Sequence, residues 1–333
     1  MRWIDWILRG IGQVVFQNNW LSGLIIVAAI YFNSWVYGTA CLVGTIASTL
    51  TAQALGMNQS MIRDGLFGFN GALLAIGLNA YMSQDFTKGD LPDWRLYVYI
   101  VLGAAFTSVV VAALATLLAP YRVPVLTAPF VLTAWLFIFA VVRFSTLEPG
   151  PLLAPAAPMP FNGPTDYSWI TWYQGIGNGI GEVFFQDNWL SGLIILIGIL
   201  VNSRIAAAMA FAGSTIAVGV AIVLGAAESS IRTGLFGFNA VLTALAIGGI
   251  FYVLTFRGLL YTLFGVVVTT WVWAAVAVAL SPVGMPTFTS AFVIVTWLMI
   301  MAKGGVGGLT AVPPDEATTP EDNLRRWRAS IAS

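Results

Sequence analysis

Gly10-Ile-Gly-Gln-Val-Val-Phe-Gln-Asn-Asn-Trp-Leu-Ser-Gly23 occurs twice in this chain, the second time as Gly179-Ile-Gly-Glu-Val-Phe-Phe-Gln-Asp-Asn-Trp-Leu-Ser-Gly192. A second block, Ile62-Arg-Asp-Gly-Leu-Phe-Gly-Phe-Asn70, returns at the same spacing along the chain as Ile231-Arg-Thr-Gly-Leu-Phe-Gly-Phe-Asn239. Two long blocks repeated at one constant spacing indicate an internal duplication. We therefore expect two halves of equivalent structure.

The duplicated sequence is apolar almost throughout. Apolar residues make up 59% of the 333 residues and charged residues 8%, against roughly 25% charged residues in an ordinary soluble domain. Mean hydropathy is +0.87. A membrane-spanning helix needs roughly 20 apolar residues, and runs of about that length cover 11–32, 35–57, 66–82, 94–119, 123–142, 175–201, 205–225, 235–254, 256–280 and 285–302. These runs predict an all-α polytopic membrane protein.

The order of these runs predicts how the chain is divided and inserted. Five crossings per copy is an odd number, so we expect two inverted-topology repeats, with re-entrant or half-spanning segments and a pore at the repeat interface. The predicted divisions are a first membrane repeat over 1–145, a Pro- and Gly-rich extracytoplasmic linker over 146–168, the inverted repeat over 169–302, and a polar cytoplasmic tail over 303–333. With both termini in the cytoplasm, ten of the 14 Lys and Arg residues lie inside, as the positive-inside rule favours.

Composition also narrows the function. The chain has no histidine, one cysteine and a formal net charge of zero, so it lacks imidazole chemistry, an internal disulfide and a basic face for nucleic acid. We expect no metal, no cofactor and no enzyme activity. An integral membrane enzyme using Glu182, Asp187, Ser22 or Ser191 and a purely structural protein are the other classes that we considered.

Polar side chains interrupt the first apolar run of each copy. Gln13 and Glu182 occupy equivalent positions, and either hydrogen-bond neighbouring helices or line a solute path. The pairs Asn18–Asn19 and Asp187–Asn188 are expected to cap the helices that begin near Trp20 and Trp189. The predicted caps imply that each run is broken before these helices begin.

Two further duplicated elements contain candidate pore residues. In the Gly-Leu-Phe-Gly-Phe-Asn block, Leu73 and Leu242 follow Phe69 and Phe238 by four residues, a spacing that by itself usually means core packing. The asparagines that end the two blocks are interpreted as caps.

The third duplicated element comprises 127–130 and 289–292, and its copies lie slightly closer together along the chain than those of the long blocks. It contains Thr127 and Thr289, which follow prolines at the start of membrane segments. Such threonines either bond to their own helix or contribute to a wet path. Duplicated hydroxyls and a Gln/Glu pair among aromatics favour a path for a small, neutral, hydrogen-bonding solute.

At these residues the chain resembles the urea transporter family over about residues 10–302. The two long blocks and the proline–threonine boxes Val123–Phe130 and Met285–Phe292 carry the resemblance together, although the second box has Ala where the family has its second proline. The resemblance implies a homotrimer of passive channels, in which aromatic slots flanked by rows of oxygen acceptors hold planar urea. It also implies the slot and wall residues: Phe16, Phe69, Leu73, Val183, Phe185, Phe238 and Leu242, with oxygens from Gln13 and Glu182 and with Thr127 and Thr289 at the central constriction.

The resulting prediction is facilitated diffusion of urea, with related small amides or water as secondary solutes and membrane lipids as surroundings. The alternative is an ion- or proton-coupled transporter of a small amide that uses Glu182 and Asp187 as coupling carboxylates. Ammonium and formate channels are disfavoured because the chain has no histidine. We expect a plasma membrane, in particular a bacterial inner membrane.

Overall fold

The computed structural model describes residues 2–82, 93–147, 150, 153–158 and 163–332. The regular secondary structure of the described residues is helical, apart from an isolated bridge between Tyr252 and Ala311. The first half contains α1 (Arg2–Gln13), α2 (Trp20–Asn33), α3 (Trp35–Ala54), α4 (Gln59–Arg63), α5 (Gly68–Met82), α6 (Trp94–Leu118), η1 (Ala119–Tyr121) and α7 (Ala128–Arg143). The second half contains α8 (Trp169–Gly181), η3 (Glu182–Phe184), α9 (Trp189–Asn202), α10 (Arg204–Val223), α11 (Glu228–Arg232), α12 (Gly237–Leu245), η4 (Ala246–Ile250), α13 (Phe256–Leu280), η5 (Ser281–Val283), α14 (Ser290–Met301), η6 (Ala302–Gly304) and α15 (Pro320–Ala332).

Within the described residues, five helices are long and apolar enough to cross a membrane, or six if the bent pair α8–α9 counts as one span. They are Trp35–Ala54, Trp94–Tyr121, Arg204–Val223, Glu228–Ile250 and Phe256–Val283. The prediction of an all-helical, multiply spanning membrane protein is confirmed at this level. The apolar runs 123–142 and 285–302 form the shorter helices α7 and α14.

The apolar runs 11–32 and 175–201 are each broken, as their polar residues indicated. The axis bends by 69° between Trp169–Phe184 and Trp189–Asn202. The predicted caps are confirmed for Asn19 and Asn188, whose side chains accept hydrogen bonds from the first backbone N–H groups of α2 and α9. They are wrong for Asn18 and Asp187, which hydrogen-bond Asp64 and Asn178 instead.

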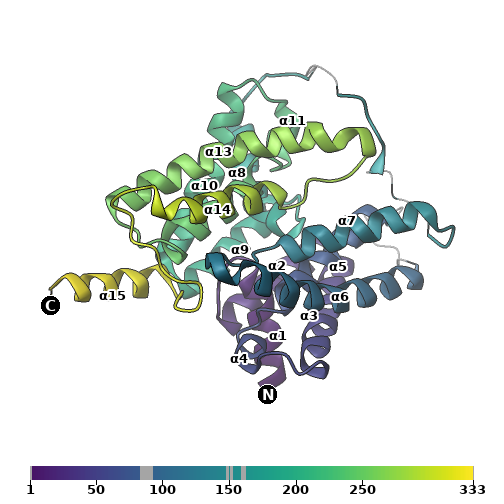
Figure 1. The fold of residues 1–333 in the computed structure, drawn as a ribbon. Helices are drawn as coiled ribbons and strands as arrows, with labels where there is room; N and C mark the ends of the chain where they lie inside the picture. The colour runs from purple at the N-terminus through teal and green to yellow at the C-terminus, as the bar shows by residue number, and fades with distance from the viewer. Residues whose placement is uncertain (1, 83–92, 148–149, 151–152, 159–162, 333) are drawn as a thin grey trace.

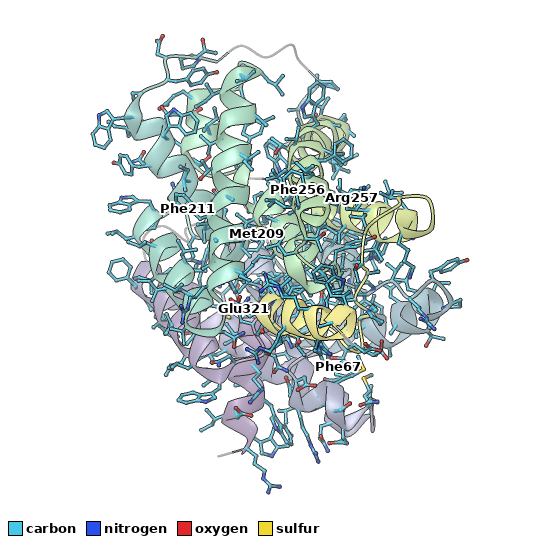
Figure 2. All side chains as sticks on the ribbon, turned by 90° about the vertical axis from the view of Figure 1, so that its left-hand side faces the viewer. Phe67, Met209, Phe211, Phe256, Arg257 and Glu321 are labelled. Atoms are coloured by element: carbon cyan, nitrogen blue, oxygen red, sulfur yellow. The ribbon has the colours of Figure 1, made fainter. Side chains whose placement is uncertain are left out.

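The two halves pack side by side, with α2 against α9 and α7 against α14 (Figure 1). Large apolar side chains also cover the outside of the bundle. Phe211 on α10 and Phe256 on α13 are both exposed there (Figure 2). An apolar outer surface of this kind fits hydrocarbon surroundings.

The sequence predicts a polar tail over 303–333. This tail contains α15, which packs onto the second half. Asn323 donates to the carbonyls of Gly249 and Ile250, where the helical path of α12 ends, at 2.7 and 3.2 Å. Glu321 accepts from Ser203 and from the backbone N–H of Ile205 at the start of α10 (Figure 2). The tail therefore caps two helix ends of the second half. The predicted linker at 146–168 lies partly outside the described residues.

Candidate solute path

Each helix break ends in a phenylalanine with a left-handed backbone. Phe16 has φ 62° and Phe185 has φ 59°, a conformation that costs a side-chain-bearing residue about 1–2 kcal/mol. The Gln17 N–H donates to the Gly12 carbonyl at 2.9 Å, and the Gln186 N–H donates to the Gly181 carbonyl at 3.1 Å. These hydrogen bonds close the two turns. A Cβ on these glycines would meet the returning chain at 2.4 and 2.5 Å, so the turn requires glycine. The strained aromatic is held in the same way in both halves.

Each of these aromatic rings packs on a ring of the other half. Phe16 meets Phe292 edge to face, with ring centroids 6.2 Å apart, and Phe185 meets Phe130 in the same manner at 6.3 Å. Phe292 and Phe130 are equivalent residues at the start of α14 and α7. The contact is therefore reciprocal, so two aromatic pairs lie at the boundary between the halves.

A third ring extends each pair. Phe251 packs on Phe16 at 5.8 Å, and Phe288 packs on Phe185 at 6.1 Å. Beside the second group, a Cβ at Gly77 of α5 would lie 3.2–3.3 Å from the rings of Phe185, Phe130 and Phe288. The missing side chain of Gly77 leaves these rings room on that side.

Two threonines meet between the halves. The hydroxyls of Thr127 and Thr289 lie 2.7 Å apart and are buried. Each threonine is the residue before α7 or α14 and follows a residue with positive φ, Leu126 or Phe288. Their pairing brings the two proline–threonine boxes together at the boundary between the halves.

Buried asparagines fix the boxes in place. Asn70 accepts from the N–H of Phe130 at 2.9 Å, and Asn239 accepts from the N–H of Phe292 at 2.8 Å. Asn239 also donates to the carbonyl of Phe288 at 3.1 Å. The interpretation of these asparagines as caps is confirmed, but each caps α7 or α14 and not the helix that contains it.

Reciprocal hydrogen bonds join the halves around this centre. Trp135 of α7 donates to the Pro286 carbonyl, and Trp297 of α14 donates to the Pro124 carbonyl, both at 2.8 Å. These are the carbonyls of the box prolines. The tryptophans occupy equivalent positions, since each follows the threonine of its own box at the same spacing.

A second reciprocal set lies at the helix breaks. Asn202 donates to Gln17, and Asn33 donates to Gln186, at 2.9 and 3.0 Å. Asn33 and Asn202 occupy equivalent positions of the two copies, as do Gln17 and Gln186. Each half thus holds the other by the same contacts, as a twofold relation between the copies requires.

Gln13 and Glu182 occupy equivalent positions but form different contacts. Gln13 donates from Nε2 to the Asp64 carbonyl at 2.9 Å, so its amide nitrogen joins two segments while its Oε1 accepts no hydrogen bond among the described residues. Glu182 lies at the second break, as the first residue of η3. Its carboxylate forms no side-chain hydrogen bond in the described part of the chain. Both breaks therefore present an acceptor oxygen.

The remaining predicted residues are buried near these features. Val183 lies in η3, between Glu182 and Phe185 along the chain. Phe69 and Phe238 directly precede the cap asparagines, and Leu73 and Leu242 lie one turn further along α5 and α12; all five side chains are at most 8% exposed. No ring contact joins Phe69 or Phe238 to Phe16 or Phe185 among the described residues.

Several residues at this centre were not predicted. Phe130 and Phe292 lie in the third duplicated element, so the repeat itself could have identified them. Trp135 and Trp297 follow the two copies of that element at the same spacing. The repeat could not have identified Phe251, because the equivalent residue in the first half is Met82 and not an aromatic residue.

Comparisons with known proteins agree with this geometry. The family model described as "Urea transporter" matches residues 4–304. The chain is similar to Urea transporter 1 of Ovis aries, at 32% identity over 324 residues, which cover 97% of this chain and 83% of the relative. Urea transporter 1 of Rattus norvegicus is also 32% identical over 324 residues, with the same coverage. The match covers the helix breaks, the proline–threonine boxes and both halves, and the chain belongs to the urea transporter family.

Proposed function

We propose that the chain conducts urea passively across a membrane, along a path between its two halves. Family membership supports urea transport and excludes an enzyme. The observation that carries the path is the pair of reciprocal aromatic contacts between the halves, Phe16 with Phe292 and Phe185 with Phe130, together with the Thr127–Thr289 hydroxyl contact.

The chemistry of urea suits such a path. Urea is planar and neutral, and its four N–H donors lose water when it leaves solution. Removing a hydrogen-bonded amide from water costs several kcal/mol unless other acceptors replace the water. Flat ring faces admit a flat solute, and oxygens along one side replace its hydration. Several weak sites allow release, which conduction requires.

We assign the residues as follows. Phe16, Phe69 and Leu73 line the slot contributed by one half, and Phe185, Phe238 and Leu242 line the other, with Val183 at the wall. Phe130 and Phe292 join them because they touch Phe185 and Phe16. The Gln13 Oε1 atom and the Glu182 carboxylate add acceptors, and Thr127 and Thr289 form the constriction.

The membrane arrangement is also a proposal. Reciprocal bonds from Trp135 and Trp297 support a twofold relation between the halves. The sequence has five apolar runs in each half, an odd number, and we therefore propose that this relation is inverted. We propose repeats at 1–145 and 169–302, a linker at 146–168, a tail at 303–333, both termini in the cytoplasm, and a homotrimer in a bacterial inner membrane.

One experiment tests the path. We would measure urea efflux from proteoliposomes by stopped-flow light scattering, with thiourea and formamide as comparison solutes. Glu182→Gln and Thr289→Val should both slow urea efflux while the protein remains folded, because each removes an oxygen from the path. The control is Thr215→Val on α10, whose hydroxyl only bonds back to Phe211, and it should leave efflux unchanged.

The outcomes are distinct. No urea flux above that of protein-free vesicles would refute the function. Normal flux in both Glu182→Gln and Thr289→Val would refute the site assignment while leaving the function intact.

A further inference from the structure

A pocket of about 250 Å³ lies next to the first aromatic pair, and none of the residues just assigned to the path lines it. Phe251 lines it and also packs on Phe16 at 5.8 Å. Opposite walls come from Arg122, which follows η1, and from Lys303, which follows α14. The segment Ala311–Pro314, from the chain between α14 and α15, completes the pocket. Residues from both halves and the tail thus converge on one space.

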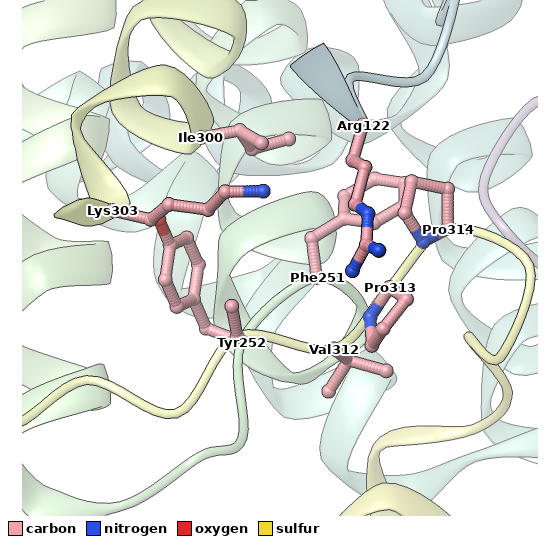
Figure 3. A pocket seen from close by; sticks show the side chains of 9 residues that line it. Arg122, Phe251, Tyr252, Ile300, Lys303, Val312, Pro313 and Pro314 are labelled. Carbon is pink, nitrogen blue, oxygen red and sulfur yellow. The ribbon is translucent and has the colours of Figure 1, made fainter. Parts of the chain in front are cut away.

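The pocket concentrates positive charge. Figure 3 shows the Lys303 ammonium and the Arg122 guanidinium directed toward the same space. Among the described residues neither side chain has an ion pair or hydrogen bond, and no acidic residue lines the pocket. Both side chains are exposed at the mouth of the pocket, so solvent weakens the repulsion between these two like charges but supplies no fixed counter-charge. A bound anion would relieve this repulsion.

The backbone of Arg122 gives an independent reason to consider this residue functional. Arg122 has φ 52°, and its equivalent in the second half, Gly284, has φ 63°. Glycine adopts this left-handed conformation easily, whereas arginine is strained in it. The duplicated turn therefore uses the favoured residue at one site and a strained arginine at the pocket. Strained residues of this kind persist where the side chain has a role.

The tail holds the pocket together. The Val312 N–H donates to the Phe251 carbonyl at 2.9 Å, and the Val253 N–H donates to the Thr310 carbonyl at 2.9 Å. This pairing holds Pro313 and Pro314 in the pocket wall, where Figure 3 shows them beside the Arg122 side chain. The result is a preformed site with a basic rim and apolar walls.

We propose that this pocket binds a small oxyanion, a phosphate or carboxylate group. Arg122 offers a planar fork that matches two oxygens of such a group, and Lys303 offers a point charge opposite it. Because Phe251 connects the pocket with Phe16, bound anion restrains the ring at one end of the aromatic pair and slows the solute. This last effect rests on the proposed urea path, whereas anion binding does not.

The test uses the purified full chain and radiolabelled inorganic phosphate in equilibrium dialysis. We expect one saturable site per chain, with affinity at least tenfold weaker in Arg122→Gly and in Lys303→Gln. Arg122→Gly copies the turn of Gly284, so it retains the fold. The control Arg328→Gln removes one exposed charge from α15, away from the pocket, and should leave the affinity unchanged. Absence of saturable binding, or an affinity in both pocket variants equal to that of the unaltered chain, would overturn the proposal.

Two further arms separate related possibilities. An anionic lipid headgroup offers the same phosphate chemistry, so dialysis is repeated in nanodiscs of phosphatidylcholine and of phosphatidylglycerol. Weaker phosphate binding in the phosphatidylglycerol nanodiscs assigns the site to lipid, and equal binding in both kinds of nanodisc assigns it to soluble anions.

Urea efflux is then measured with phosphate on both sides of the vesicles. Phosphate binding without any urea flux would refute the channel and keep the site, and urea flux without phosphate binding would do the reverse.

Discussion

Phe16 and Phe185 combine two properties that single residues rarely share. Each holds a strained left-handed backbone, and each directs its ring against the opposite half. A glycine in these turns would relieve the strain but would remove the ring. The retained aromatic therefore indicates that the ring contributes more than the turn. Gly77 is the converse case, since the rings beside it need the space that a side chain would fill.

Gly77→Ala tests that space. Its Cβ would approach the rings of Phe185, Phe130 and Phe288 to 3.2–3.3 Å, so we expect urea efflux to fall several-fold. Stability should change little, because alanine favours a helix by up to about 1 kcal/mol over glycine, which offsets the crowding. The control Gly219→Ala on α10 has only an ordinary contact at 3.6 Å with Trp172. Equal efflux in the two variants would show that Gly77 does not border the path.

At the scale of elements, the short helices α7 and α14 depend on helices distant in sequence. Their first turns are capped by asparagines of α5 and α12, across 60 and 53 residues. Those asparagines sit among fully buried neighbours, where no water replaces a lost bond. The position of each proline–threonine box therefore depends on one long-range cap.

Asn239→Ala should destabilise the fold by about 1–3 kcal/mol, the usual consequence of leaving a buried backbone donor without a partner. The measurement is thermal unfolding in detergent. Asn58→Ala is the control, because Asn58 caps α4 at an exposed site. A smaller loss of stability for Asn239→Ala than for Asn58→Ala would contradict the role of Asn239 as a long-range cap of α14.

These elements also show what sequence could and could not predict. The breaks at 14–19 and 183–188 were predictable, because amides inside an apolar run cannot face lipid. That Asn70 is a cap was predictable from residue type, but its partner helix was not, since the pairing is set by tertiary contact. The packing of the tail was also missed. Its polar composition indicated a solvated segment, yet Asn323 and Glu321 use that polarity to cap helix ends.

For the whole molecule, the central feature is reciprocity between the halves. Trp135 and Trp297 bond the box proline of the opposite half at the same distance, and Asn33 and Asn202 repeat the pattern at the breaks. Such pairs stabilise one mutual orientation of the halves, in which both aromatic pairs and the threonine pair form. A duplicated sequence predicts two similar halves, but only the structure reveals these contacts.

Trp135→Phe and Trp297→Phe should each lower stability by about 0.5–1.5 kcal/mol, the usual contribution of a hydrogen bond, and by similar amounts. Their effects should nearly add in the double variant if the two bonds act independently. Thermal unfolding provides the measurement. Trp271→Phe, at a side chain that is 58% exposed, should have no effect. A large loss from one tryptophan and none from the other would contradict the reciprocal arrangement.

The most direct test of passive urea conduction between the halves is urea movement in proteoliposomes under an imposed membrane potential and an imposed proton gradient. A channel predicts efflux that follows the urea gradient alone and is unchanged by either force, even though Glu182 and Asp187 lie at the helix breaks. Accumulation of urea against its own gradient, driven by potential or protons, would contradict the channel and identify those carboxylates as coupling groups.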